Sequence, residues 1–127
     1  MLDGAHNGTS MEVLFDSLRT YFGSRPKTVI FGSSREKNLH PMLQHALADS
    51  AFFIATRSAN PRAQEPRIIL EATSRMRWMG PVFWRNSIQE SLQTAQRISP
   101  KNAVIIVTGS LFLAGEARKV LKCPTSI

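Results

Sequence analysis

Residues 103–110 read AVIIVTGS, an unbroken apolar run that ends in a Thr-Gly-Ser turn. Apolar runs without polar alternation are typical of parallel strands that are covered on both faces. Two more runs of this kind lie upstream, Thr28 to Phe31 and Ala51 to Ala55. Together with Ala103 to Val107 they predict three neighbouring parallel strands, and the shorter run Val82 to Trp84 predicts a fourth.

Between these runs the apolar residues recur at the helical period of 3.6 residues. The first such stripe begins at Met11 and carries a capping-box signal at Thr9 and Glu12, with Gly23 as its stop. The other helices are predicted from the Ser87–Glu90 capping box onward, after Pro41, from Pro66 to about Arg75, and from about Leu111 to Leu121.

Strands that alternate with helices predict an α/β fold with right-handed crossovers. We expect residues 1–127 to form a single three-layer, Rossmann-like domain. Its mainly parallel sheet should have about five strands, with helices on both faces.

Composition limits the classes of protein that fit. The 43% share of hydrophobic residues excludes a disordered or fibrous chain. The single cysteine, Cys123, excludes a disulfide framework and an all-cysteine metal site, and no apolar run approaches the roughly 18 residues of a membrane span. We therefore expect a cytoplasmic protein. Its net charge of +7 favours anionic partners, among which nucleotides, polycarboxylates and nucleic acid all qualify.

In a fold of this kind, ligands bind at the carboxyl ends of the strands. That rule singles out Asp3 to Thr9, Gly32 to Asn38, Thr56 to Gln64 and Thr108 to Ser110. We expect these four segments to share one edge of the sheet.

The first of these segments is the densest in polar groups. The carboxylate of Asp3 suits ribose hydroxyls, while His6 and Asn7 can hydrogen-bond a base, a phosphate or a carboxylate. The alternative is a polar turn in which Asn7 and Gly8 adopt positive φ and His6 is solvated.

Two further residues are candidates for anion contact. Ser110 follows a buried strand and precedes a helix, so its hydroxyl either donates to a ligand or caps the helix. Arg62 is either exposed or reaches for an anion. We find no metal-ligand spacing for any His, Cys or paired acid, and no G-x-x-x-x-G-K-[ST] phosphate loop.

These loops, in this order, resemble the C-terminal domain of folylpolyglutamate synthase/dihydrofolate synthase, a branch of the Mur ligase family. The resemblance covers nearly the whole chain. The matching segments are Leu2-Asp3-Gly4-Ala5-His6-Asn7, Val29 to Gly32 with Glu36-Lys37-Asn38, Thr56 with Pro61-Arg62-Ala63, and Val107 to Arg118.

The chain departs from the family pattern at three places. Gly8 stands where the family usually has a proline after the His-Asn pair, and Phe112 replaces a tyrosine. The family's Asp-Lys-Asp triplet is Glu36-Lys37-Asn38 here.

The resemblance implies an ATP- and Mg²⁺-dependent ligase that phosphorylates the γ-carboxylate of a folate's glutamate tail. The amino group of an incoming glutamate then attacks the acyl phosphate. By motif position, Asp3, His6 and Asn7 would bind ATP. The incoming glutamate would contact His6, Ser110 and Arg62.

The resemblance also implies that a larger central domain carries the phosphate loop and most metal ligands. We therefore expect a lone C-terminal domain that is not an enzyme by itself and needs a P-loop domain in cis or trans. Folate or dihydropteroate and glutamate would be its substrates. Two other classes stay open: a non-catalytic nucleotide- or anion-binding module, and a small basic nucleic-acid-binding protein whose only support is the net charge.

Overall fold

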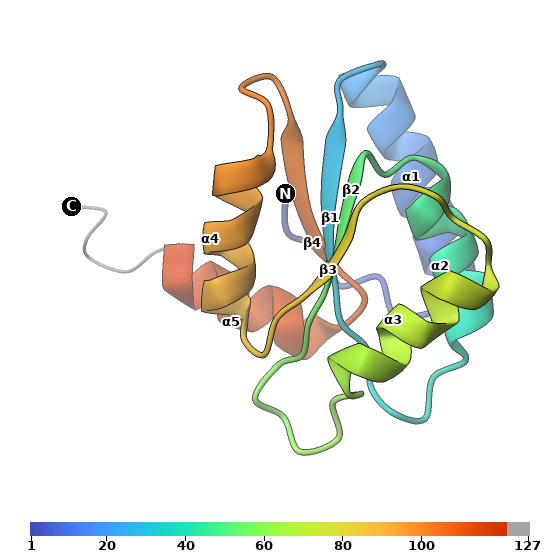
Figure 1. Cartoon of the computed structure of the whole chain (residues 1–127), viewed down its shortest axis with the longest axis vertical. Helices are drawn as coiled ribbons and strands as arrows, with labels where there is room; N and C mark the ends of the chain where they lie inside the picture. The colour runs from blue at the N-terminus through green and yellow to red at the C-terminus, as the bar shows by residue number, and fades with distance from the viewer. Residues whose placement is uncertain (122–127) are drawn as a thin grey trace.

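The computed structural model describes residues 1–121. Helices and strands alternate along them, as Figure 1 shows. In chain order the elements are α1 (Gly8–Phe22), β1 (Lys27–Phe31), α2 (Leu39–Ala48), β2 (Phe52–Ala55), α3 (Pro66–Arg75), β3 (Val82–Trp84), α4 (Ile88–Ile98), β4 (Val104–Thr108) and α5 (Leu111–Leu121).

All pairings in the sheet are parallel, in the order β3-β2-β1-β4. In register, Val29 of β1 lies beside Phe53 of β2 on one side and Ile106 of β4 on the other. The three apolar runs are therefore neighbouring strands, as predicted, and the short run Val82–Trp84 is the fourth.

The prediction of about five strands was wrong, because the sheet has four in residues 1–121. Within residues 1–121, the segment beside the outer edge of β4 is the one that carries Leu2, which forms an isolated parallel bridge with Val107. A single bridge with its flanking hydrogen bonds is too short to count as a strand.

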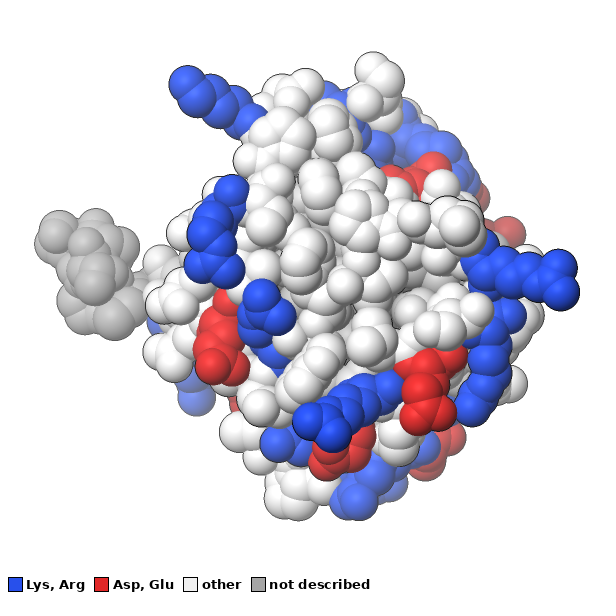
Figure 2. All heavy atoms as spheres, in the orientation of Figure 1, with Lys and Arg blue, Asp and Glu red and all other residues white. Residues whose placement is uncertain are grey.

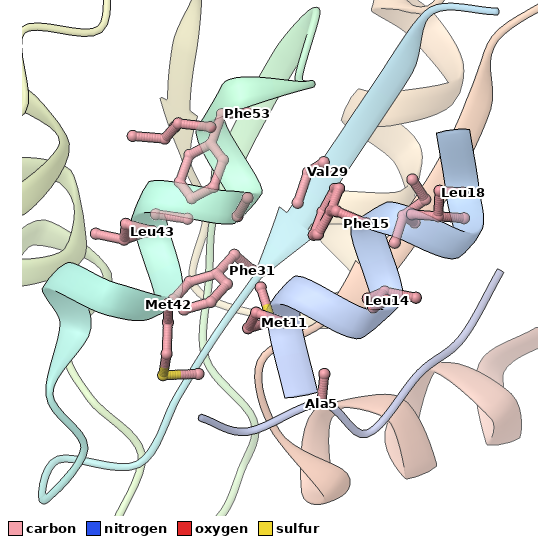
Figure 3. Close-up of a cluster of buried hydrophobic side chains, with 14 of the residues drawn as sticks. Ala5, Met11, Leu14, Phe15, Leu18, Val29, Phe31, Met42, Leu43 and Phe53 are labelled. Carbon is pink, nitrogen blue, oxygen red and sulfur yellow. The ribbon is translucent and has the colours of Figure 1, made fainter. Parts of the chain in front are cut away.

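The sheet is covered on both faces, which confirms the three-layer prediction. Residues that alternate along each strand point into different cores: Phe31 packs with α1, α2 and α3, whereas Ile30 packs with α4 and α5. Figure 3 shows the first core, in which Phe15 of α1 and Leu43 of α2 lie near the β1 side chains. Layers on both sides explain why the strands are apolar without alternation.

Two helix starts differ from the prediction. Helix α1 is capped by Asn7, not Thr9: the Asn7 side chain accepts from the Ser10 N–H, and its backbone is extended at φ −154°. The alternative in which Asn7 adopts positive φ was therefore also wrong. Helix α2 begins at Leu39, two residues before Pro41, because a proline is tolerated in the first turn, where its missing N–H leaves no hydrogen bond unmade.

Candidate functional site

The start of the chain is fixed to the carboxyl end of β4 by backbone hydrogen bonds. The Val107 N–H donates to the Met1 carbonyl at 2.8 Å, and the Asp3 N–H donates to the Val107 carbonyl at 2.9 Å. One residue beyond β4, the Gly109 N–H donates to the Ala5 carbonyl at 3.0 Å. In Figure 3 the segment that carries Ala5 passes between the first turn of α1 and α5. The loop 3–7 and the turn 108–110 are therefore in direct contact.

Only a glycine fits at position 109. Its φ is +107°, and a Cβ atom there would stand 2.2 Å from the Gly32 carbonyl oxygen. The Gly32 N–H in turn donates to the Thr108 carbonyl at 3.2 Å. The turns after β1 and β4 are thus packed backbone against backbone.

The two remaining loops join the same edge of the sheet. The Arg35 N–H donates to the Arg62 carbonyl at 2.8 Å, and the Gln64 N–H donates to the Ser33 carbonyl at 2.7 Å. All four segments that the strand-end rule singled out therefore lie at one edge, as expected.

Asp3 is half-buried and has one carboxylate oxygen in use. Its Oδ1 accepts from the Ala5 N–H at 2.7 Å, which holds the local turn. The other oxygen, Oδ2, has no hydrogen-bond partner within residues 1–121. One oxygen thus orients the carboxylate while the other is free to accept from a ligand hydroxyl.

The imidazole of His6 is oriented by a backbone carbonyl. Its Nδ1 lies 2.9 Å from the Gly4 oxygen, which can only accept. Nδ1 is therefore the protonated nitrogen in this arrangement, and Nε2 of the neutral ring carries the lone pair. His6 then presents an acceptor to a ligand, and it becomes a donor there only when the ring is charged.

The amide oxygen of Asn7 caps α1 by accepting from the Ser10 N–H at 2.8 Å. The amide nitrogen keeps two N–H groups that can face an anion. Ser10 itself was not predicted to be functional, although its hydroxyl contacts both residues 6 and 7. The available signal was its position three residues after Asn7, the spacing of a capping box.

Ser110 caps α5. Its Oγ accepts from the N–H groups of Phe112 at 3.1 Å and Leu113 at 3.3 Å, and the residue is buried at 7% exposure. The capping half of the sequence prediction is thus observed. The Ser110 O–H has no acceptor within residues 1–121 and could still donate to a ligand.

Arg62 lies at the same edge but is not part of the group formed by the loop 3–7 and Ser110. Its guanidinium is exposed and is 3.4 Å from Glu36. It has no hydrogen bond or ion pair to that group in the described part of the chain. The structure therefore brings Asp3, His6 and Asn7 to the turn of Ser110 and leaves Arg62 on the neighbouring loops.

Other site types find little support in the described residues. Within 1–121 no three His, Cys, Asp or Glu side chains come together as metal ligands, and no helix there is long and apolar enough to cross a membrane. On the face shown in Figure 2, Lys and Arg lie around an uncharged centre with Asp and Glu among them. The Arg67 guanidinium lies 4.9 Å from the centroid of the Trp84 ring, so this face of the ring is not open to a stacked nucleic-acid base.

The fold and its edge loops define a three-layer α/β domain with polar loops gathered at the carboxyl edge of a parallel sheet. A profile described as "Mur ligase, glutamate ligase domain" matches residues 1–111, and the chain belongs to this family. The predicted family resemblance is thus confirmed.

Relatives narrow the branch within that family. The chain is 29% identical over 127 residues to dihydrofolate synthetase of Saccharomyces cerevisiae, covering 94% of this chain and 30% of that protein. It is 32% identical over 122 residues to folylpolyglutamate synthase of Lacticaseibacillus casei, covering 95% of this chain and 26% of that protein. The chain is thus similar to one part of enzymes of the folylpolyglutamate/dihydrofolate synthase type, and it spans under a third of the length of these relatives.

Solved structures agree with the fold. Folylpolyglutamate synthase of Mycobacterium tuberculosis complexed with ADP superposes with a TM-score of 0.86 at 21% identity, covering 94% of this chain and 29% of that one. Folylpolyglutamate synthase of Thermotoga maritima gives a TM-score of 0.81 at 29% identity, covering 96% and 27%.

Proposed function

We propose that this chain is the C-terminal domain of an ATP-dependent ligase that adds glutamate to a folate-type substrate, and that it closes over ATP and the incoming glutamate. Family membership and the names of the relatives support the reaction class. The hydrogen bond from the Gly109 N–H to the Ala5 carbonyl is the observation that carries the proposal for the site. This bond holds the loop that carries Asp3, His6 and Asn7 against the turn that carries Ser110, the cap of α5.

The hydrogen-bonding chemistry of each residue assigns it to one of the two ligands, ATP or the incoming glutamate. The free oxygen of Asp3 accepts from a ribose hydroxyl of ATP, and the amide N–H groups of Asn7 donate to phosphate oxygens. Nε2 of neutral His6 accepts from the amino group of the incoming glutamate. The Ser110 O–H and the exposed guanidinium of Arg62 face its carboxylates.

In the family reaction, ATP phosphorylates a carboxylate and the glutamate amine displaces the phosphate to form an amide. Phosphoryl transfer of this kind depends on a phosphate-cradling loop, its lysine and Mg²⁺. Residues 1–121 hold no cluster of metal ligands, so we assign Mg²⁺ to a P-loop domain supplied in cis or trans. In this proposal the chain is a single domain located in the cytoplasm. Without the P-loop domain it is inactive.

Nucleotide binding tests the ATP half of the proposal. Without the P-loop domain this chain supplies only part of the contacts to ATP, so it should bind ATP weakly. At ten times its dissociation constant, ATP would raise the unfolding free energy by only about 1.4 kcal/mol. We expect a small thermal shift with millimolar ATP that Asp3→Ala abolishes.

The matched control is Asp16→Ala, an exposed aspartate on α1 whose carboxylate pairs with Arg19. It changes the net charge equally and should leave the ATP shift intact. An equal loss in both variants would mean that ATP responds to overall charge, and the ATP site at Asp3 would be wrong. ATP binding that never supports ligation with a P-loop domain would instead favour the non-catalytic binding module.

A further inference from the structure

The entrance to α1 differs from the family pattern because of a neighbouring helix. A Cβ atom on Gly8 would stand 2.9 Å from the Cβ of Pro41 in α2, so Pro41 occupies the space that a proline at position 8 would need. A proline at the first helical position would fix φ and thereby the loop before it. Glycine does not restrict φ in this way, so His6 and Asn7, the two residues between the backbone contact at Ala5 and the helix, need another group to hold them.

The Ser10 hydroxyl is the group that does so. Its oxygen accepts from the His6 N–H at 3.0 Å and from the Asn7 N–H at 3.1 Å. It lies 2.9 Å from Asn7 Oδ1, to which it can donate. The Ser10 N–H donates to that same Oδ1 at 2.8 Å. One side chain therefore fixes the backbone of both predicted ligand residues.

His6 is thus held at two ends, by Ser10 at its backbone N–H and by the Gly4 carbonyl at Nδ1. The second contact selects the Nδ1–H tautomer and points the lone pair of Nε2 away from the loop. The hydrogen bond to Gly4 depends on the backbone orientation of His6 relative to Gly4, and the Ser10 contact at the His6 N–H helps to fix that orientation.

We propose that Ser10 is a positioning residue, which holds His6 in the tautomer that accepts from the amine of the incoming glutamate. This inference rests on the proposed function, because it assigns a use to the Nε2 lone pair. It adds a residue that the predicted site does not contain.

The first test measures the tautomer in the 127-residue chain by ¹⁵N NMR of the His6 imidazole. We expect the Nδ1–H form to dominate, Ser10→Ala to shift the ring toward Nε2–H, and Ser10→Thr, which keeps the hydroxyl, to restore it. Ser17→Ala is the control, because this half-buried serine of α1 has no side-chain hydrogen bond within residues 1–121. A wild-type tautomer in folded Ser10→Ala would overturn the proposal.

The second test uses the chain combined with a P-loop domain. Ser10→Ala should raise the KM for glutamate about tenfold, the loss of a single oriented hydrogen bond. The KM for ATP should change less, because the backbone N–H of residue 10, which alanine keeps, still donates to Asn7 Oδ1. Ser10→Thr should restore the KM. A uniform fall in kcat without a KM change, equal to that of Ser17→Ala, would show a merely structural role and contradict the proposal. A changed tautomer with an unchanged KM for glutamate would leave the positioning intact and remove His6 from the glutamate site in the proposed function.

Discussion

Ser110 has two separable roles, and substituting it tests both. The change Ser110→Ala removes the oxygen that accepts from the N–H groups of Phe112 and Leu113 at the start of α5. Loss of an N-cap serine lowers the unfolding free energy by about 0.5–2 kcal/mol. Because Ser110 is 7% exposed and two N–H groups lose their acceptor, we expect about 2 kcal/mol, measured by urea unfolding.

The chain offers a matched control in Ser87, which caps α4 by accepting from the Glu90 N–H at 3.2 Å. Ser87→Ala should lower the unfolding free energy by about 1 kcal/mol. It should leave glutamate use unchanged, because the hydrogen bonds of Ser87 found in residues 1–121 stay within α4.

The functional readout is the glutamate requirement of the chain combined with a P-loop domain. If the Ser110 hydroxyl also donates to a glutamate carboxylate, its loss is worth about 1.5–3 kcal/mol, or roughly a ten- to a hundredfold higher KM. Ser110→Ala that is folded, less stable and unchanged in its glutamate dependence would show that Ser110 is a helix cap only.

Five further substitutions test how the edge of the sheet and its surroundings are built, each by the change in unfolding free energy. Gly109→Ala should lower the unfolding free energy by at least about 2 kcal/mol, because a Cβ would clash with a backbone carbonyl at a positive φ. Gly115→Ala, in the interior of α5 where a Cβ has open space, should raise it by about 0.5–1 kcal/mol. Similar changes in both would contradict the reasoning. Arg77→Gly should raise it by up to about 1 kcal/mol, since Arg77 has a φ of 57° after α3, and a loss of stability would refute the strain. Thr56→Val should raise the unfolding free energy by about 1 kcal/mol, because it removes a buried hydroxyl without a partner in residues 1–121. Thr28→Val should lower it by a similar amount, because it breaks a 2.6 Å hydrogen bond to Ser99. The same sign for both changes would be evidence against this hydrogen-bond argument.

Much of the fold was predictable because the periodicity of the apolar residues agrees with the positions of the proline, glycine and capping residues that begin or end helices. The start of α3 follows from Pro66 at its first position, and the start of α5 from the Gly109 turn before it. The start of α1 was predicted wrongly because two overlapping capping signals, at Asn7 and Thr9, differ only in which backbone N–H each side chain can reach. Such a choice depends on the path of the preceding loop, which here is fixed by β4.

The location of the site at the edge of the sheet was predictable from the sequence. The polar atoms that are available for a ligand were not. The rule for parallel strands correctly predicts that the loops lie at one edge. The sequence does not reveal which polar atoms of these loops already accept hydrogen bonds from the backbone. Asp3 Oδ1, Asn7 Oδ1 and Ser110 Oγ are all occupied by backbone N–H groups. The importance of Ser10 was missed because its contacts depend on a loop conformation that no periodic pattern encodes.

The function proposed here depends most directly on whether this chain needs a P-loop domain to ligate glutamate. The deciding measurement is glutamate- and folate-dependent ADP release by the purified chain alone, by a P-loop domain alone, and by the two combined. We expect no activity from either part and ligation from the mixture. Glutamate ligation by the chain alone, free of full-length ligase, would contradict the proposal, as would a stable complex of the two parts that binds ATP and forms no amide.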